Sequence, residues 1–257
     1  MMINAPCKCC GEIFTKEYKN QKYCSIKCAN KINPQNQPRP VKLPEYSNDL
    51  AEFMGIIFGD GTVSDFYSKI WLNSLADRDY IPFVEKLAKS LFPGATVTSG
   101  KDKKDGASWI QISSKIVSSY LQKIGFNFPR RVPSWIKKNP KFIKAFIRGL
   151  FDTEGSVGLK KFNGRNGKYL YKQLTFTNKS LNLLNFVPKH LKKLGMKPTM
   201  NSRKNIYISN LKDICFFLKT IGLHNPKLIQ KALIKDYNNY RTREGRGQQK
   251  RMGVLNG

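Results

Sequence analysis

One short pattern occurs twice in this chain and constrains its fold more than any other feature. Residues 50–63 read LAEFMGIIFGDGTV and residues 144–157 read KAFIRGLFDTEGSV, so each copy is an apolar helical run that ends in an acidic residue and a glycine. The matches at a constant offset of 94 positions are Ala51 with Ala145, Gly55 with Gly149, Asp60 with Glu154, Gly61 with Gly155, and Val63 with Val157. A repeated helix that ends in a carboxylate predicts a site with approximate two-fold symmetry.

The elements that follow each motif also repeat. For the first copy we expect a helix from Ser47 to about Gly61, a strand at 68–75, a helix at 79–92, strands at 95–99 and 108–114, and a helix at 115–126. For the second copy we expect a strand at 171–178, a helix at 179–195, strands at 197–202 and 205–210, and a helix at 211–223. The sequence therefore predicts an α+β fold, a tandem duplication of an αββαββα unit with two antiparallel sheets and helices on one face of each.

Charge indicates the partner of such a fold. The chain has 46 Lys and Arg against 17 Asp and Glu, a formal net charge of +29. A folded chain this basic repels itself unless a polyanion binds it, and nucleic acid is the leading polyanion. The sequence has no apolar run of the length that crosses a membrane and no signal peptide, so we expect no membrane partner and an intracellular location, in a bacterial or phage-host cytoplasm or an organelle.

Cysteines crowd into the first 28 residues, in the pattern of a metal site rather than of disulfides. Cys7 and Cys10 form a C-x2-C knuckle, and Cys24 and Cys28 form a C-x3-C pair. Four thiolates at this spacing predict a closed structural Zn²⁺ site. A register with Cys9 in place of Cys10 remains open. The segment resembles treble-clef-like fingers with the pattern CxxCG…YCSxxC, which bind DNA or proteins.

A proline-rich stretch separates this finger from the duplicated body. The stretch is polar and lacks apolar periodicity, as linkers do. The expected organisation is a zinc-finger-like module at 1–32, a linker at 33–46, the first repeat at 47–138, the second repeat at 139–240 and a basic tail at 241–257.

The two motifs resemble the LAGLIDADG signature of homing endonucleases in its two-motif, monomeric form. FMGIIFGDG places glycine third and Asp60 eighth, and IRGLFDTEG places Gly149 and Glu154 in the same positions. The resemblance covers roughly residues 47–240 and includes the αββαββα order. It implies a site-specific endonuclease that binds a long, asymmetric double-stranded DNA site and hydrolyses phosphodiesters on both strands in an intron-homing process.

The motif also makes physical sense without the family name. Gly55 with Gly59, and Gly149 with Thr153, give each helix a face of small residues on which the two helices can approach closely. Such a crossing would bring the two acidic helix ends together, where the carboxylates repel each other and the helix dipoles. Mg²⁺ held by Asp60 and Glu154, with the backbone of Gly59 and Thr153 as further ligands, would relieve this repulsion and activate water.

Basic residues should surround that centre. The family resemblance implies catalytic lysines after the second strand and before the final helices of each repeat, positions that Lys179 and Lys227 fit. The counterpart of Lys227 in the first repeat is Arg130, which can clamp a phosphate but cannot accept a proton at neutral pH. A plain phosphate contact is an equal alternative for each of these cations.

Alternate side chains on the strands are the candidates for reading bases in the major groove. The candidates are Lys69, Trp71, Asn73, Ser108, Gln111, Lys172, Gln173, Thr175, Thr177, Arg203, Asn205 and Tyr207. If the parity of a strand is wrong by one residue, its listed residues point away from the DNA and their neighbours face it.

Other functions compete with cleavage. A relative of the same fold that no longer cuts could act as an RNA maturase with intron RNA as partner, or as a DNA-binding regulator, and a bifunctional protein stays open. A zinc-dependent adaptor would explain the cysteines but not the duplication. The intein-embedded form of the family is disfavoured, since no flanking splicing segments are visible.

Overall fold

The computed structural model describes residues 3–32, 40–102, 106–126, 129–164, 167–201 and 205–233. The chain divides into two compact units, Met1–Val41 and Lys42–Gly257. Half of the predicted linker and all of the predicted basic tail lie outside the described residues. No helix in the described ranges is long and apolar enough to cross a membrane.

The first unit is small and built around one hairpin. Strands β1 (Asn4–Pro6) and β2 (Ile13–Thr15) pair antiparallel, and helix α1 (Ile26–Ile32) follows. The hairpin turns at Gly11, whose φ of +78° favours glycine, and the Gly11 N–H donates to the Cys7 carbonyl at 2.9 Å. This turn brings the first cysteine pair together.

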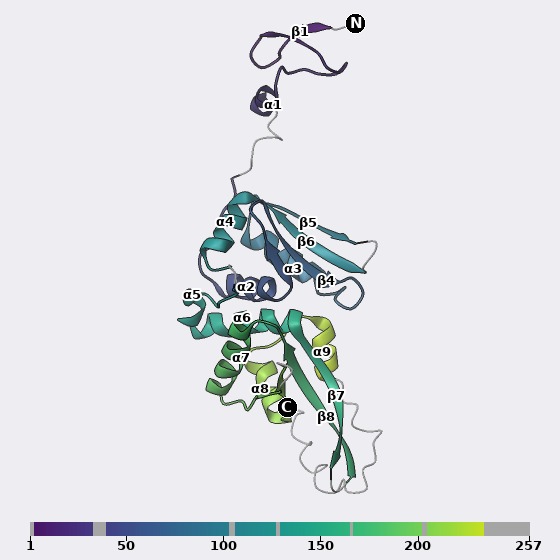
Figure 1. Cartoon of the computed structure of the whole chain (residues 1–257), viewed down its shortest axis with the longest axis vertical. Coiled ribbons are helices and arrows are strands. Elements are labelled where there is room, and N and C mark those ends of the chain that lie inside the picture. The colour runs from purple at the N-terminus through teal and green to yellow at the C-terminus, as the bar shows by residue number, and fades with distance from the viewer. Residues whose placement is uncertain are drawn as a thin grey trace. The chain divides into compact units, whose positions relative to one another are not determined.

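The second unit repeats one order of elements twice (Figure 1). The first repeat has α2 (Asn48–Asp60), β3 (Gly61–Val63), β4 (Tyr67–Asn73), α3 (Ile81–Leu91), β5 (Thr96–Lys101), β6 (Ala107–Ser113), α4 (Lys115–Lys123) and the short α5 (Ser134–Lys137). The second has α6 (Pro140–Glu154), β7 (Gly155–Gly164), β8 (Gly167–Thr177), α7 (Leu181–Lys193), β9 (Thr199–Met200), β10 (Asn205–Ile208), α8 (Leu211–Thr220) and α9 (Pro226–Leu233). Helices α5 and α9 were not among the expected elements.

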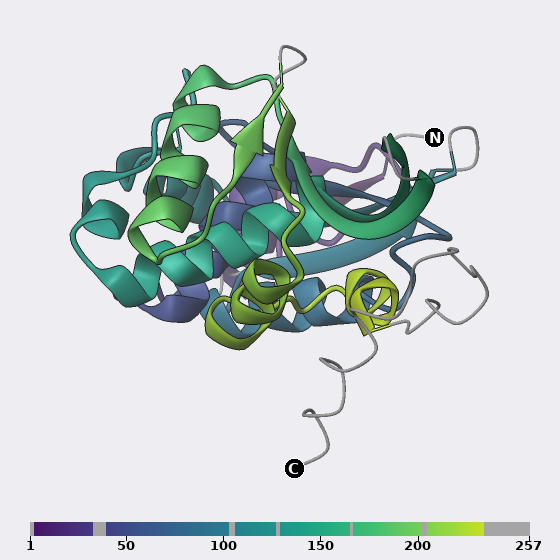
Figure 2. The ribbon, with the colours of Figure 1, turned by 90° about the horizontal axis from the view of Figure 1, so that it is seen from below.

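The two sheets have the same topology. One has the strand order β3-β4-β6-β5 and the other β7-β8-β10-β9, with every pairing antiparallel. Figures 1 and 2 show helices covering one side of each sheet, with the β7–β8 ribbon projecting away from them. The predicted α+β class with tandem αββαββα repeats is therefore confirmed.

Helices α2 and α6 cross at the centre of this unit with their backbones in contact. A Cβ added to Gly55 would lie 2.2 Å from the Phe146 carbonyl oxygen, and one added to Gly149 would lie 2.2 Å from the Glu52 carbonyl oxygen. A Cβ on Gly59 would lie 2.1 Å from the Thr153 Oγ1 atom. The predicted interface of small residues is confirmed, and nearly all of α2 is buried as a result.

The glycine after each motif ends its helix without a left-handed cap, since the Gly61 and Gly155 N–H groups donate to the Ile57 and Phe151 carbonyls. Gly61 and Gly155 have φ values of −108° and −86°, so neither adopts the left-handed conformation of a glycine cap. Each begins a strand directly, and an added Cβ would meet the preceding helical turn, at 2.2 Å from Ile57 Cγ1 and from the Phe151 carbonyl oxygen respectively. The abrupt turn from helix to strand fixes the acidic residue at the end of each helix.

Candidate functional site

The acidic residues of the two motifs end α2 and α6, and both are half-buried. Burial, and next the Asp77 carboxylate, raise the pKa of Asp60 to about 6, although Arg130 and Lys227 oppose the shift. Burial, and next Asp60, raise the pKa of Glu154 to about 7. Glu154 packs on the other helix, since a Cβ on Gly59 would lie 3.2 Å from its Cγ. The structure thus brings together the two carboxylates that the sequence paired.

Arg130 lies at the end of α2, where carbonyl groups lack helical partners. Its guanidinium donates to the carbonyls of Phe58, Gly59 and Gly61, at 3.0 Å for the last two. Its charge also opposes the rise that burial causes in the pKa of both acids. Arg130 therefore clamps the helix end that carries Asp60.

Lys227 reaches the first repeat from the start of α9. Its Nζ lies 2.6 Å from the Asp77 Oδ1 atom, and the Asn225 side-chain amide donates to the same oxygen at 3.0 Å. Lys227 also lowers the pKa of Asp60. Asp77 thus holds the lysine near the first acid, a role that the sequence did not reveal because Asp77 belongs to no motif.

The other predicted lysine is placed differently. Lys179 is exposed, and its neighbour Asn178 contacts the second acid instead, donating from Nδ2 to the Glu154 Oε1 atom at 2.8 Å. Asn178 was not among the predicted residues.

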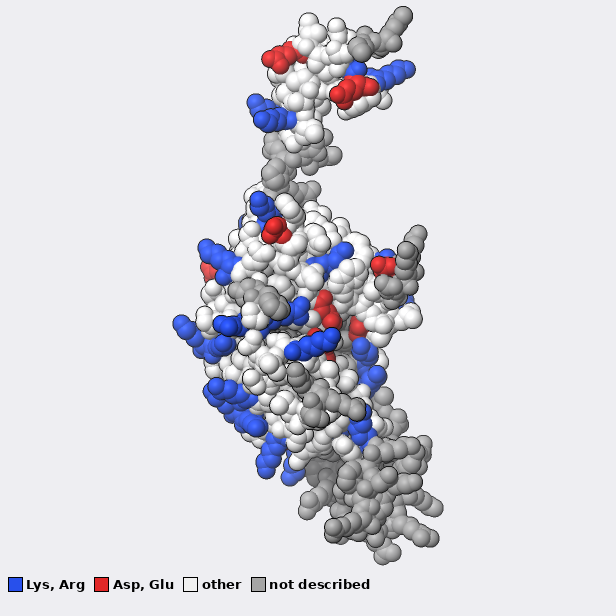
Figure 3. Space-filling model, in the orientation of Figure 1, with Lys and Arg blue, Asp and Glu red and all other residues white. Residues whose placement is uncertain are grey.

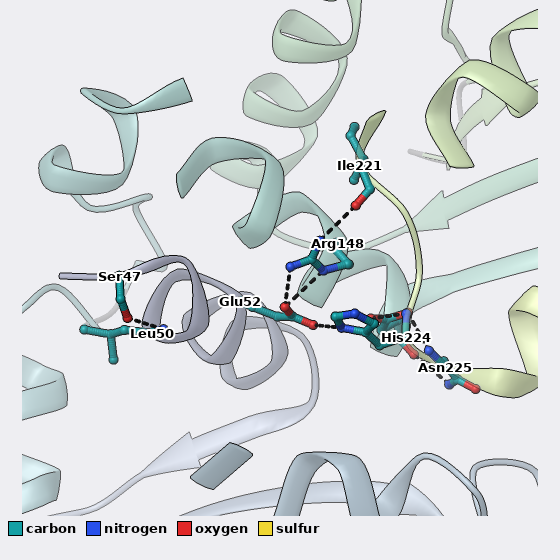
Figure 4. A network of polar contacts seen from close by, with 8 residues as sticks. Ser47, Leu50, Glu52, Arg148, Ile221, His224 and Asn225 are labelled. Carbon is teal, nitrogen blue, oxygen red and sulfur yellow. Dashed lines mark hydrogen bonds and ion pairs between the residues drawn. The ribbon is translucent and has the colours of Figure 1, made fainter. Parts of the chain in front are cut away.

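A polar network built on the buried carboxylates of Glu52 and Asp152 lies beside the helix crossing (Figure 4). Arg148 of α6 donates from Nη2 and Nε to Glu52 Oε2 of α2, at 2.6 and 3.0 Å, and the His224 Nδ1 atom lies 2.5 Å from Glu52 Oε1. Burial raises the pKa of Glu52, but the bonds from His224 and Arg148 outweigh it, so that the pKa is lowered. Asp152 accepts from the backbone N–H groups of His224 and Asn225.

Ligand atoms of Glu52, Asp152 and His224 lie within 4.8 Å of one another, as in a metal site, but Arg148 and these N–H groups already bind the carboxylates. The network is structural, and a glutamate inside an apolar helical run was its one sequence signal.

The open faces of the sheets carry most of the predicted base-reading residues. On β4, Ser68, Ile70 and Leu72 are buried toward the helices, so alternate residues point the other way. The predicted residues on open faces are Lys69, Trp71, Asn73, Gln111, Thr175, Thr177, Asn205 and Tyr207. The Lys69 Nζ atom lies 4.7 Å from the ring centroids of both Trp71 and Trp109, which positions this cation on the face of the first sheet.

The structure corrects three members of that list and leaves one undescribed. Ser108 is buried on the helix side of β6, and Lys172 shares the buried parity of Leu174 and donates to the Ala232 carbonyl. Gln173 faces the open side but is buried, with its amide 2.9 Å from Ser209 Oγ. The predictions for Ser108 and Lys172 are wrong by one residue of strand parity. Arg203 lies outside the described residues.

In the first unit, the sulfur atoms of Cys7, Cys10, Cys24 and Cys28 lie within 4.8 Å of one another. Burial raises the pKa of Cys7, but hydrogen bonds from the Cys10, Cys24 and Cys9 backbones outweigh it and lower the pKa to about 6. The cluster could hold Zn²⁺, which binds thiolates in such closed sets. Of the two registers left open by the sequence, the structure uses Cys10 and leaves Cys9 outside the set.

Comparisons with known proteins support the resemblance drawn from the motifs. A family model described as a LAGLIDADG-like domain matches residues 141–222, which lie within the second repeat. This match confirms the family resemblance for that part of the chain.

Individual relatives are distant. An uncharacterised protein of Methanocaldococcus jannaschii is 26% identical over 163 residues, which cover 62% of this chain and 59% of that protein. The replication factor C small subunit of the same organism is 28% identical over 236 residues, which cover 86% of this chain but 12% of that protein. Among solved structures, the homing endonuclease I-DmoI in complex with DNA and Ca is 20% identical, with a TM-score of 0.48, over 70% of this chain and 93% of that one. The chain thus spans less than two thirds of the length of each of the first two relatives, 59% of one and 12% of the other.

Proposed function

We propose that the chain is a divalent-metal-dependent DNA endonuclease that binds a long, asymmetric duplex site and cuts both strands. The observation that carries the proposal is the placement of Asp60 and Glu154 at the ends of two helices whose backbones touch. Carboxylates with pKa values raised to about 6 and 7 are costly to ionise without a cation nearby. Such an arrangement is expected where a cation binds.

The donor chemistry fits Mg²⁺. Asp60 and Glu154 supply hard oxygen ligands, and Mg²⁺ is commonly held by one or two carboxylates together with phosphate oxygens. When bound there, the ion would supply water activation and neutralise charge on the leaving oxygen. Lys227, held by Asp77, would provide a cation for the scissile phosphate near Asp60, and Arg130 would keep the Asp60 helix end in place.

The DNA would lie along the open faces of the two sheets. These faces carry Lys69, Trp71 and Asn73 on one sheet and Thr175, Asn205 and Tyr207 on the other. Because the two sets differ, the target should be asymmetric. The net charge of +29 predicts an affinity that falls steeply with salt, as counterions are released from the phosphates.

Acid-to-amide variants test the cleavage proposal. Asp60→Asn and Glu154→Gln should each abolish double-strand cleavage in Mg²⁺ and leave specific binding intact. A randomised duplex library, with sequencing of cleaved ends, would identify the site first. The exposed pair Asp79→Asn and Glu17→Gln is the matched control and should cut normally. Full cutting by either motif variant would overturn the assignment, whereas binding by the wild type without cutting would favour a regulator or maturase.

We also propose that Cys7, Cys10, Cys24 and Cys28 hold one structural Zn²⁺, that the finger forms a separate module, and that the protein acts as a monomer. Zinc would contribute to folding of this module rather than to catalysis. Metal analysis should find one zinc per chain, lost in a Cys7→Ser and Cys24→Ser double variant and retained in Cys9→Ser. Equal loss in Cys9→Ser would contradict the ligand set.

A further inference from the structure

A hollow of about 430 Å³ lies on the helical side of the second unit, bordered by α5, the segment before it, and α7. Four basic side chains line it: Arg131, Lys137, Lys189 and Lys193. Two amides, from Asn182 and Asn185, complete the polar lining. We call this hollow the basic pocket.

The four cations of the basic pocket lack nearby acidic partners. The sequence contains no Asp or Glu between Asp105 and Asp152, and none between Glu154 and Asp213. Helices α5 and α7 therefore carry no carboxylate, and within the described residues no ion pair involves any of the four cations. Positive charges gathered around a concavity repel one another. They attract anions, because a bound anion offsets this repulsion.

The basic pocket is separate from the surface proposed for the cleaved duplex. Helix α7 contacts β10 of the sheet, and its buried residues Leu183, Leu184 and Val187 lie on a different face of the helix from the pocket residues Asn182, Lys189 and Lys193. In Figure 1, α5 and α7 lie on the left, and the β7–β8 ribbon projects on the right. Figure 3 shows blue side chains gathered along this left side, over α5, α6 and α7. DNA lying on the open sheet faces would not cover this surface.

The lining favours phosphate over a carboxylated protein surface. Guanidinium and ammonium groups bind phosphate oxygens strongly, and amides add neutral donors. The half-buried ring of His190 also lines the hollow, and it packs on the buried ring of Phe186 with centroids 4.0 Å apart.

We propose that the basic pocket binds the phosphodiester backbone of a second nucleic-acid segment, distinct from the duplex on the sheets. The segment could come from a folded RNA or from a distal part of the DNA, and the phosphate chemistry is shared by both. This binding would be independent of the sequence of the cleaved site, because backbone contacts carry no sequence information.

Charge-removal variants test the site. The triple variant Lys137→Gln, Lys189→Gln, Lys193→Gln is compared with Lys86→Gln, Lys123→Gln, Lys219→Gln, which removes the same charge from exposed lysines on α3, α4 and α8. Affinities for an RNA hairpin and for a 30-base-pair duplex are measured over a range of salt without added Mg²⁺. For one of the two probes, we expect the affinity of the pocket variant to fall about tenfold or more below that of the control variant. The slope of log affinity against log salt concentration should be flatter by about 2.

The chain's two histidines give a second readout that needs no variant. His190 lies in the pocket, where burial, and next Lys193, Lys189 and Lys137, lower its pKa, although its hydrogen bond to the Phe186 carbonyl opposes the shift. A bound phosphate would offset those charges and raise the pKa of His190, while the exposed His224, which contacts Glu52, serves as the internal control.

Proton NMR of the two imidazoles during titration with each probe distinguishes the sources. A rise in the pKa of His190 with RNA assigns the pocket to RNA, and a rise with the duplex assigns it to distal DNA. An unmoved His190 signal at saturation, with equal affinity in the pocket and control variants, would overturn the proposal. Loss of cleavage in Asp60→Asn does not affect this test, so the pocket and the proposed endonuclease can fail separately.

Discussion

The two repeats share a backbone but differ in their polar side chains. Gly55 and Gly149 are equivalent and make the same contact in opposite directions. Phe58 and Asp152 are also equivalent, yet Phe58 packs edge-on against Phe126 with ring centroids 5.3 Å apart, whereas Asp152 accepts from backbone N–H groups of the loop between α8 and α9. Backbone contact at the crossing leaves no room for variation in either copy, while the surroundings of each helix end can diverge.

The basic residues diverge in the same way. Arg130 and Lys227 are counterparts, but Arg130 binds the end of its own repeat's helix, whereas Lys227 crosses to Asp77 of the other repeat. Near Glu154 the corresponding polar contact is the neutral Asn178. The two acids therefore have unequal neighbours, and we expect the two DNA strands to be cut at unequal rates.

The largest effect should come from breaking the helix crossing, to which both repeats contribute an equivalent glycine. Gly55→Val and Gly149→Val each place a Cβ about 2.2 Å from a carbonyl oxygen of the opposite helix, which only separation of the helices can relieve. Each should cost more than about 4 kcal/mol in the free energy of unfolding, measured by chemical denaturation. Gly158→Val is the control, because no atom lies within 4 Å of its added Cβ. A stable Gly149→Val protein would show that the crossing is looser than the structure has it.

The next largest effect concerns the ion pair between Arg148 and Glu52, and the first repeat has no arginine at the position equivalent to Arg148. Met54 is the counterpart of Arg148, so Arg148→Met makes the two helices more alike but leaves the buried Glu52 carboxylate without its arginine. We expect a loss of about 3 kcal/mol in unfolding free energy. Adding Glu52→Met should recover most of it, since an apolar pair is often as stable as a buried ion pair. Lys141→Met, exposed on the same helix, should change little, and a neutral Arg148→Met would contradict the network.

These contacts also mark how far the sequence could predict the structure. Glycines and acids at fixed spacing predicted the helix crossing and the paired carboxylates, because both follow from local helical geometry. Asp77 and Lys227 could not be paired in this way, since they are separated by 150 positions and share no motif. Lys172 was misplaced because strand parity depends on a register that a polar, alternating sequence leaves open.

A smaller effect should separate the two halves of the cleavage site. Asp77→Asn removes the charge that holds Lys227 near Asp60, so we expect one strand to be cut about tenfold more slowly, a difference of about 1.4 kcal/mol in the barrier. Nicked duplex should accumulate in a plasmid assay. Asp79→Asn, an exposed neighbour with the same charge change, should cut both strands as the wild type does. Equal slowing of both strands by Asp77→Asn would show that Lys227 serves the two halves alike.

The smallest expected effect is a pH dependence of stability without Mg²⁺. The folded-state pKa values of Asp60, about 6, and Glu154, about 7, lie above the ordinary values near 4, so folding favours the protonated carboxyls. This contribution is fully present below the unfolded-state pKa values and is lost as the pH rises through 6 for Asp60 and through 7 for Glu154. The melting temperature of the metal-free protein should therefore fall by a few degrees between pH 5 and pH 8.

Amide variants isolate the contributions of Asp60 and Glu154 to that fall, to which Asp152, whose pKa burial raises to about 7, also contributes. Asp60→Asn should remove a loss that is complete by about pH 6, and Glu154→Gln a loss that continues to about pH 7, so both should melt above the wild type at pH 8. Added Mg²⁺ should raise the wild-type melting temperature at pH 8 and leave the variants nearly unchanged, because a ligand stabilises the state that binds it. Scanning calorimetry at constant ionic strength measures both effects. If Glu154→Gln melts below the wild type at pH 8, then the carboxylate is already compensated within the protein, and the electrostatic argument for a shared cation fails at that half of the site.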